Sequence, residues 1–319
     1  MNDFHLIESS VPSYMDGTGT CQPITETVLT QDRTPVYKIF DTLWLELTLT
    51  CNLECVHCYA NSSPSVRQGI CTTDQWLHLL DEAATHRCHR VIIIGGEPTL
   101  HPDIIQILSH AAQKEFQEIH LFTNATHLTP GLCDAIESLG IIVDFSFYSF
   151  DARTHDKITR KKGSWQKTLK GIASLLARQV PISANIVLMD KNNSHYQSTV
   201  DFLTDFGVKD IHVDGVRDSG RGASMKHGKQ WEPASIRPLS GKFPIKISID
   251  PDGKAFPCPG TRNIVLGNIG KTPLSDILLS TERIHCIGCQ YICKEIYDEK
   301  NPTASRSSSD TISSDTTRK

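Results

Sequence analysis

The chain has 319 residues, with 36 acidic and 32 basic side chains and a formal net charge of -4 at pH 7. This length allows one large α/β domain with a small appendix, or two ordinary domains. The acidic balance gives no basic surface to bind phosphates, so we expect no nucleic-acid partner. Because the sequence shows neither a signal-peptide pattern nor an apolar run of about 18 residues, we expect a cytoplasmic protein without membrane association.

Short apolar runs alternate with segments of helical period from about residue 41 onward, a pattern typical of repeated βα units and a mostly parallel sheet. Thr72 and Gln75 have the spacing of a capping box, and Thr129, Pro130 and Gly140 mark the two ends of a later helix. Six units predict a partial (β/α)6 TIM-like barrel, since eight are needed for closure. The expected strands are 43–49, 91–94, 118–123, 141–147, 182–189 and 211–216; the expected helices are 72–86, 104–111, 129–140, 165–178 and 198–206.

The βα alternation ends in a segment rich in Gly, Ser, Pro and Lys, residues 220–244, which we interpret as a linker. Two alternating runs around Pro251 to Gly253 then predict a β-hairpin. The last residues are polar and predict a disordered tail. The sequence thus divides into an N-terminal extension (1–40), a barrel (41–230), a small C-terminal domain (240–298) and the tail (299–319).

The chain has eleven cysteines, which in a reducing compartment are better read as metal ligands or reactive thiols than as disulfides. Cys71, Cys88 and Cys133 lie in helical segments and are interpreted as small buried residues, as is usual for isolated cysteines. Cys21 is likewise isolated. Seven cysteines form two groups: Cys51, Cys55 and Cys58, then Cys258, Cys286, Cys289 and Cys293.

The first cysteine group, in "CNLECVHCYA", directly follows the first expected strand. Three thiolates leave one iron of a four-iron four-sulfur cluster without a protein ligand, and that iron can bind a substrate or cofactor. Loops at the carboxyl ends of barrel strands are also where active sites form. The next strand ends in Gly95, Gly96, Glu97 and Pro98, where glycines allow close backbone approach and a carboxylate can accept hydrogen bonds from an ammonium group.

Together, C-x3-C-x2-C and "GGEP" resemble the radical S-adenosylmethionine (radical SAM) superfamily. This resemblance implies a 4Fe-4S cluster on Cys51, Cys55 and Cys58, whose open iron binds S-adenosylmethionine and whose reduction yields a 5'-deoxyadenosyl radical that abstracts a substrate hydrogen. It implies that residues 95–98 hold the methionine amino group. Further cofactor contacts are implied for Thr123, Asn124 and Ser146, although Tyr148 and Ser149 stand where many relatives have Asp-Gly.

The C-terminal pattern "PDGKAFPC...LGNI...C-x2-C" resembles the extension called SPASM, or its shorter twitch version. A full SPASM domain has seven cysteines for two clusters. The four present here are enough for one auxiliary 4Fe-4S cluster. The implied ligands are Cys258, Cys286, Cys289 and Cys293.

The two cysteine groups and several polar residues also allow simpler interpretations. A zinc ion completed by His57 or a distant residue is an alternative for the first cysteine group, and a zinc ion held by all four cysteines is an alternative for the second. Cys71 follows the cluster loop and is a speculative hydrogen donor to a substrate radical. Arg217 and Arg221 are either surface charges or anion contacts at the barrel mouth, and Asp144 has no role beyond that of a strand-edge residue.

The resemblance makes maturation of a ribosomally synthesised peptide, by crosslinking or epimerisation, the leading functional hypothesis. A dehydrogenase or epimerase acting on an aminocyclitol, sugar or nucleoside in natural-product biosynthesis is the alternative, and a non-catalytic zinc-binding scaffold is an alternative of another class. The implied partners are a peptide or small-molecule substrate, an electron donor such as flavodoxin or ferredoxin, and a separate leader-peptide-binding protein.

Overall fold

The computed structural model describes residues 35–217, 219–225, 243–260, 262 and 264–280, together with three short strands nearer the N-terminus. Of residues 13–15, 21–23, 27–29, 35–39, 243 and 244 only the backbone is described. Three predicted ligands, Cys286, Cys289 and Cys293, and the predicted tail lie outside the described residues.

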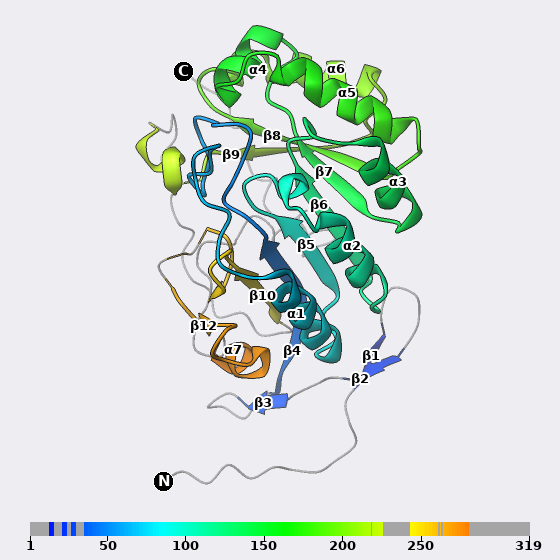
Figure 1. The fold of residues 1–319 in the computed structure, drawn as a ribbon, viewed down its shortest axis with the longest axis vertical. Coiled ribbons are helices and arrows are strands. Elements are labelled where there is room, and N and C mark those ends of the chain that lie inside the picture. The colour runs from blue at the N-terminus through cyan, green and yellow to red at the C-terminus, as the bar shows by residue number, and fades with distance from the viewer. Residues whose placement is uncertain are drawn as a thin grey trace, which may run out of the picture.

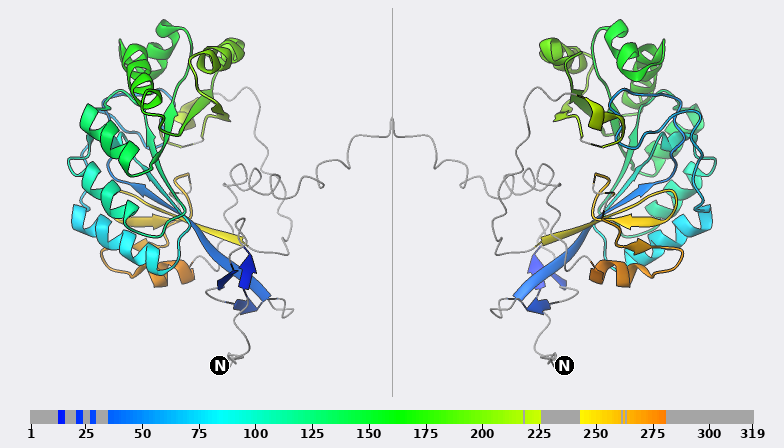
Figure 2. Two further views of the ribbon diagram at one scale, coloured as in Figure 1. Left: turned by 90° about the vertical axis from the view of Figure 1, so that its right-hand side faces the viewer. Right: turned by 90° about the vertical axis from the view of Figure 1, so that its left-hand side faces the viewer.

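The six expected strands form one parallel sheet, in which each strand pairs with the next along the chain. Their carboxyl ends therefore lie at one edge of the sheet, where the site is built. The sheet curves and carries helices on one face (Figures 1 and 2), so the predicted partial barrel is confirmed. The strands are β4 (Pro35–Glu46), β5 (Arg90–Ile94), β6 (Glu118–Thr123), β7 (Ile142–Ser146), β8 (Ile182–Leu188) and β9 (Asp210–Gly215).

A seventh parallel strand comes from the C-terminal part of the chain. β10 (Phe243–Ile249) lies parallel to β4 and extends the barrel sheet at that edge. The predicted hairpin is present, because β11 (Lys254–Phe256) returns antiparallel to β10 through a turn where Gly253 has a φ of 79°. The strands at this edge are completed by β12 (Gly267–Asn268) beside β11 and β3 (Thr27–Leu29) beside β4; β1 (Ser13–Met15) and β2 (Cys21–Pro23) pair separately.

The helices follow the predicted pattern with two additions, α4 and α7. The Thr72–Gln75 capping box begins α1, and the Thr129 hydroxyl accepts a hydrogen bond from a backbone N–H of α3. Neither α4 nor α7 was expected; the face that α4 buries, His155, Ile158 and Thr159, contains a single aliphatic side chain and so gives little apolar signal in the sequence. The helices are α1 (Thr73–Thr85), α2 (Ile104–Ala112), α3 (Pro130–Ser138), α4 (Ala152–Thr159), α5 (Ser164–Leu176), α6 (Tyr196–Asp205) and α7 (Leu274–Ser280).

The main core lies between the sheet and its outer helices. Alternate residues of β4 and β5, such as Leu45 and Ile93, pack against the apolar faces of α1 and α2, on which Trp76 and Ile107 are fully buried. The intervening strand residues face the inner side of the sheet, where side chains such as Glu46 and Asp144 are buried as well. The fold therefore separates an apolar outer layer from a polar inner face.

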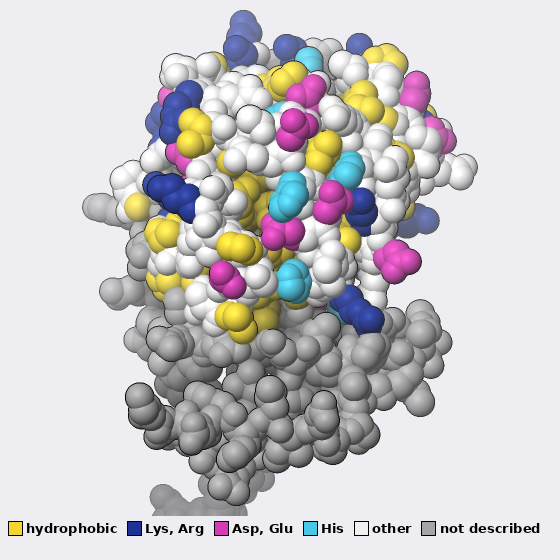
Figure 3. Space-filling view, turned by 60° about the horizontal axis from the view of Figure 1, so that its bottom comes forward, with side chains coloured by type: hydrophobic (Ala, Val, Ile, Leu, Met, Phe, Trp, Pro, Cys, Tyr) yellow, Lys and Arg dark blue, Asp and Glu magenta, His cyan; other side chains and the backbone are white. Residues whose placement is uncertain are grey.

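Charged side chains on the face shown in Figure 3 are mixed in sign, with Lys and Arg lying among acidic and His side chains. The expectation of no nucleic-acid partner stays a prediction. In the part of the chain that the structure describes, no helix combines the length and apolarity that crossing a membrane requires.

Gly171 in α5 provides a test of how this helix supports the site. A Cβ atom at Gly171 would lie 2.1 Å from the carbonyl oxygen of Ala125, whereas one at Gly131 in α3 would meet nothing within 4 Å. We expect Gly171→Ala to lower the free energy of unfolding by about 1–3 kcal/mol through overpacking, and Gly131→Ala to raise it by up to about 1 kcal/mol. Urea denaturation measures both, and a stabilised Gly171→Ala would contradict the close approach.

Candidate active site

The loop that carries Cys51, Cys55 and Cys58 follows β4, and the last turn of α4 is hydrogen-bonded to its backbone. The backbone N–H groups of Glu54 and Val56 donate to the carbonyl oxygens of Thr159 and Ile158, at 3.0 and 2.9 Å. These carbonyls belong to the last turn of α4, where they lack partners within the helix. Helix α4, which the sequence analysis missed, therefore fixes the middle of the cysteine loop.

Arg221 ties the same loop to the end of β9. Its Nε donates to the carbonyl oxygen of Cys55 at 2.8 Å, and its Nη2 donates to that of Ser62 at 2.7 Å. Beside it, Gly220 lies so close to Cys58 that a Cβ atom would come within 2.4 Å of its carbonyl oxygen. The guanidinium of Arg221 thus binds backbone carbonyls of this chain through Nε and Nη2, and its interpretation as an anion contact stays a prediction.

Two thiols of this loop, Cys51 and Cys55, lie in surroundings that disfavour free thiolates. Burial raises the pKa of Cys51, and the nearby carboxylate of Glu97 raises it further; burial also raises the pKa of Cys55, to about 12. Among the described residues, no three His, Cys, Asp or Glu side chains converge on a position for a single metal ion. The geometry thus does not favour one zinc ion, whereas the cysteines of an iron–sulfur cluster each bind a different iron and lie farther apart.

Gly95 and Gly96 directly follow β5. The backbone that follows the neighbouring strand β4 comes so close to them that neither position has room for a side chain. A Cβ atom at Gly96 would lie 2.3 Å from the carbonyl oxygen of Thr50, and Gly95 has a φ of +150°. The N–H groups of Gly96 and Glu97 donate to the carbonyls of Thr48 and Thr50. This close contact is with protein backbone one residue before Cys51, so the glycines set the start of the cysteine loop; the predicted contact with a cofactor stays a prediction.

Glu97 is fully buried, and its carboxylate joins the ends of two strands. It accepts hydrogen bonds from the Thr99 N–H and hydroxyl, from the Thr123 hydroxyl at 2.6 Å and from the Asn124 N–H at 2.7 Å. Burial raises the pKa of Glu97, and these four hydrogen bonds oppose the shift. Pro98 is buried in the short helix Pro98–Leu100 that follows. The structure thus brings together four of the predicted positions.

Asn124 continues this network to the cysteine loop. Its Nδ2 donates to Oδ1 of Asn52 at 2.9 Å and lies 3.8 Å from the Cys51 sulfur. Its Oδ1 accepts hydrogen bonds from the N–H and the hydroxyl of Thr126. Asn124 therefore positions the loop around Cys51. The Thr123–Asn124 pair after a strand did not by itself indicate this role in the sequence.

Ser146 ends β7, where the resemblance places a ribose contact. The hydroxyl of Tyr148, two residues further on, lies within hydrogen-bonding reach of both the Ser146 hydroxyl and the Cys55 thiol. The Tyr148 ring also packs edge-on against His57, with 4.8 Å between centroids. Burial lowers the pKa of His57 to about 4, so its ring is neutral near pH 7. A tyrosine thus stands where many relatives have an aspartate, and it contacts a predicted ligand.

The remaining cysteines fall into two environments. Cys88 and Cys133 are buried in the main core, as predicted. Cys71 packs against the same core, and its N–H donates to the carbonyl of Pro251 in the β10–β11 turn. This placement gives no support to Cys71 as a hydrogen donor, which stays a prediction. Cys258 is buried two residues after β11.

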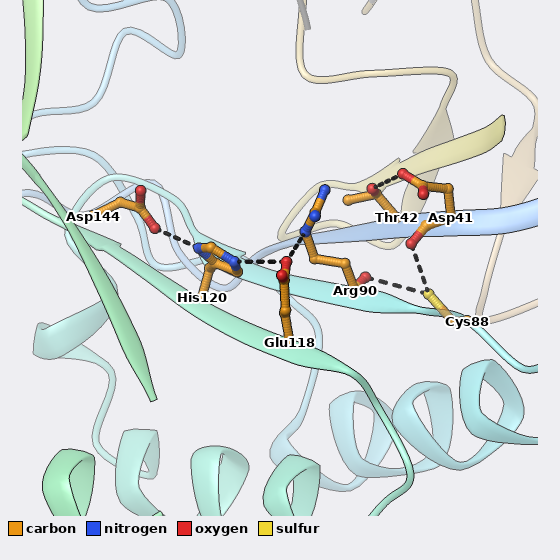
Figure 4. A network of polar contacts seen from close by, with 7 residues as sticks. All are labelled: Asp41, Thr42, Cys88, Arg90, Glu118, His120 and Asp144. Atoms are coloured by element: carbon orange, nitrogen blue, oxygen red, sulfur yellow. Dashed lines mark hydrogen bonds and ion pairs between the residues drawn. The ribbon is translucent and has the colours of Figure 1, made fainter. Parts of the chain in front are cut away.

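The inner face of the sheet carries a line of alternating charges across β5, β6 and β7 (Figure 4). Arg90 pairs with Glu118 at 2.6 Å, Glu118 with His120 at 3.3 Å, and His120 with Asp144 at 2.7 Å. Burial alone would lower the pKa of His120, but hydrogen bonds with Asp144 and Glu118 raise it to about 9. Asp144 is therefore a buried ion-pair partner, and the interpretation of it as a simple edge residue is wrong.

Comparison with known proteins bears directly on this arrangement. A family model described as "Radical SAM superfamily" matches residues 45–203, and one described as "Iron-sulfur cluster-binding domain" (SPASM) matches residues 245–302. The chain belongs to the radical SAM superfamily and carries a SPASM domain. It is an enzyme of the class that binds a 4Fe-4S cluster and S-adenosylmethionine, with auxiliary iron–sulfur binding in the SPASM domain.

Relatives and a solved structure agree with this assignment. The chain is 33% identical over 178 residues to the AdoMet-dependent heme synthase of Methanosarcina barkeri, covering 56% of this chain and 51% of the relative. It is 29% identical to the subtilosin biosynthesis protein AlbA of Bacillus subtilis, and the match covers 57% of this chain and 41% of AlbA. The chain thus spans about half the length of these relatives. Streptococcus suis SuiB bound to S-adenosylmethionine has the same fold, with a TM-score of 0.63 and 15% identity. The match covers 76% of this chain and 66% of the SuiB chain.

The residues of this radical SAM enzyme fit the cofactors that its family implies. Three thiols lie in one loop, and iron binds cysteine as the thiolate, so cluster binding would release their protons. Cys51, Cys55 and Cys58 would hold the cluster, while residues 95–98, Thr123, Asn124 and Ser146 surround the same strand ends. Cys258, the one predicted auxiliary-cluster ligand among the described residues, is buried.

Arg221 is expected to act as a positioning residue for the cluster loop. Replacing it in Arg221→Gln removes the hydrogen bonds to the Cys55 and Ser62 carbonyls, so iron should be lost to a chelator several-fold faster than from the wild type. Arg221→Lys, which can keep one bond, should be intermediate. Arg87→Gln, at an exposed arginine whose side chain makes no hydrogen bond or ion pair with the described residues, is the matched control. Equal iron-release rates in all four proteins would contradict this role.

The line of charges predicts a pH-dependent stability. Because the folded pKa of His120 is about 9 and the ordinary value is about 6.5, its contribution should be complete below about pH 6.5 and should disappear as the pH rises through 9. His120→Gln should therefore cost about 1–3 kcal/mol at pH 6 and little at pH 9.5. Urea denaturation across this range, with exposed His127→Gln as control, measures the difference. A pH-independent difference would exclude a charged His120.

Proposed function

We propose that the chain matures a ribosomally synthesised peptide by hydrogen abstraction, forming a crosslink or epimerising a residue. When bound, the reduced cluster and S-adenosylmethionine supply the 5'-deoxyadenosyl radical for that step. This chain's own residues hold the cysteine loop at the strand ends and line the inner face of the barrel with polar groups.

The SPASM domain beside the barrel carries this proposal. Its first strand, β10, continues the barrel sheet next to β4, the strand that leads into the cysteine loop. AlbA, which shares this family, is named for biosynthesis of the bacteriocin subtilosin. SuiB, which shares the fold, has also been solved bound to its precursor peptide SuiA. Both proteins therefore support a peptide substrate.

A small-molecule substrate is the second candidate. The AdoMet-dependent heme synthase, at 33% identity, is named for a tetrapyrrole product and favours small-molecule chemistry in this part of the superfamily. An aminocyclitol, sugar or nucleoside substrate stays a prediction, as do the flavodoxin or ferredoxin donor and the separate leader-peptide-binding protein. The zinc-scaffold alternative is wrong, because the chain belongs to a superfamily of enzymes.

The proposal is tested with anaerobically reconstituted enzyme, S-adenosylmethionine and dithionite. Short peptides encoded beside the gene are added, and 5'-deoxyadenosine and peptide mass are followed, with reactions run in deuterated water to reveal epimerisation. We expect wild-type enzyme to remove two hydrogen atoms per crosslink, or to exchange one for deuterium.

The variant in which Cys51, Cys55 and Cys58 are all replaced by Ala should release no 5'-deoxyadenosine and leave every peptide unchanged. If the wild type makes 5'-deoxyadenosine and converts an added tetrapyrrole or aminosugar but no peptide, the small-molecule candidate replaces the peptide proposal.

A further inference from the structure

Tyr59 directly follows Cys58 and lies where three parts of the chain meet. The Cζ atom of Arg217, which follows β9, lies 5.4 Å from the centroid of its ring. The Cζ atom of Arg262, which follows β11 in the SPASM domain, lies 5.7 Å from it. We call Tyr59, Arg217 and Arg262 the Tyr59 donor cluster.

The two guanidinium groups of this cluster differ in their contacts. Arg262 forms an ion pair with Glu46, which is fully buried and also accepts a hydrogen bond from Ser248. The guanidinium of Arg217, by contrast, makes no hydrogen bond or ion pair with the residues that the structure describes. Among the residues that the structure describes, the two guanidinium groups thus form a single ion pair, that of Arg262 with Glu46.

Buried donors in the cluster and on β10 find no acceptor among the described residues. The Tyr59 hydroxyl and the Nε of Arg262 are both shielded from solvent, and no described residue accepts a hydrogen bond from either. The ammonium group of Lys246 is buried in the same way, on the inner face of β10 two residues before Ser248. A tyrosine hydroxyl is a hydrogen-bond donor at neutral pH. Leaving a buried donor unsatisfied is costly, and a bound acceptor would recover that cost.

We propose that the Tyr59 donor cluster binds a carboxylate of the peptide substrate, either an Asp or Glu side chain or the C-terminal carboxylate; this inference rests on the proposed function. The free groups are donors and their net charge is positive, so they favour an anion over a cation or a neutral donor. A guanidinium fork matches the planar geometry of a carboxylate. Tyr59 adjoins Cys58, so the acidic residue of the substrate would be held beside the cysteine loop.

The methionine moiety of S-adenosylmethionine also carries a carboxylate, and the experiment separates the two sources. A displayed library of random short peptides is selected on reconstituted enzyme with S-adenosylmethionine and without reductant, in parallel for wild type, Arg217→Gln, Tyr59→Phe and the control Arg87→Gln. The dissociation constants of an enriched peptide, of its Gln, Asn or C-terminal amide counterpart, and of S-adenosylmethionine are then measured for each protein.

We expect wild type and Arg87→Gln to enrich acidic peptides and to bind the neutral counterpart roughly tenfold more weakly, the loss of one charge-assisted interaction. Arg217→Gln and Tyr59→Phe should bind the acidic peptide weakly and lose little more with the neutral one, with S-adenosylmethionine affinity unchanged. Enrichment without acidic residues, or weakened S-adenosylmethionine binding alone, would overturn the carboxylate site and leave peptide maturation standing. If the wild type enriches no peptide, both proposals fail together.

Discussion

The contact between two backbones, at the ends of β4 and β5, is the constraint on which the site depends. Gly96 lies against the Thr50 carbonyl so closely that no other residue fits without movement of the strand ends. The hydrogen bonds of Gly96 and Glu97 to Thr48 and Thr50 fix the chain one residue before Cys51. From this point Glu97 reaches the end of β6, and Asn124 reaches back to the Cys51 sulfur. The cysteine loop thus rests on three strand ends that hold one another.

The second half of the loop depends on elements much later in the chain. The carbonyl oxygens in the last turn of α4 accept hydrogen bonds from backbone N–H groups of the loop, and Arg221 donates to its Cys55 and Ser62 carbonyls. The C-terminal part reaches the same region through β10 and through the buried pair of Glu46 and Arg262. Because a lone charge at Glu46 would be costly to bury, the barrel and the SPASM domain stabilise each other there.

Much of this could be predicted from local patterns. The Thr72 capping box, the βα alternation and the hairpin turn at Gly253 each arise from neighbouring residues, and each is present in the structure. α4 could not be found in this way, since the face that it buries contains a single aliphatic side chain. The charged line from Arg90 to Asp144 could not be predicted from local patterns either. Its members are spread over three strands and meet only when the register of those strands is set.

The sequence by itself determined the chemistry. Cysteine spacing and the "GGEP" run are short-range features, and they indicate a radical SAM enzyme before any folding is considered. Only the tertiary structure decided how those residues are held: that β10 extends the barrel sheet, that Arg221 binds backbone carbonyls, and that Tyr59 lies beside two guanidinium groups. These contacts join residues far apart in the chain, so they depend on strand register and burial, which no local pattern encodes.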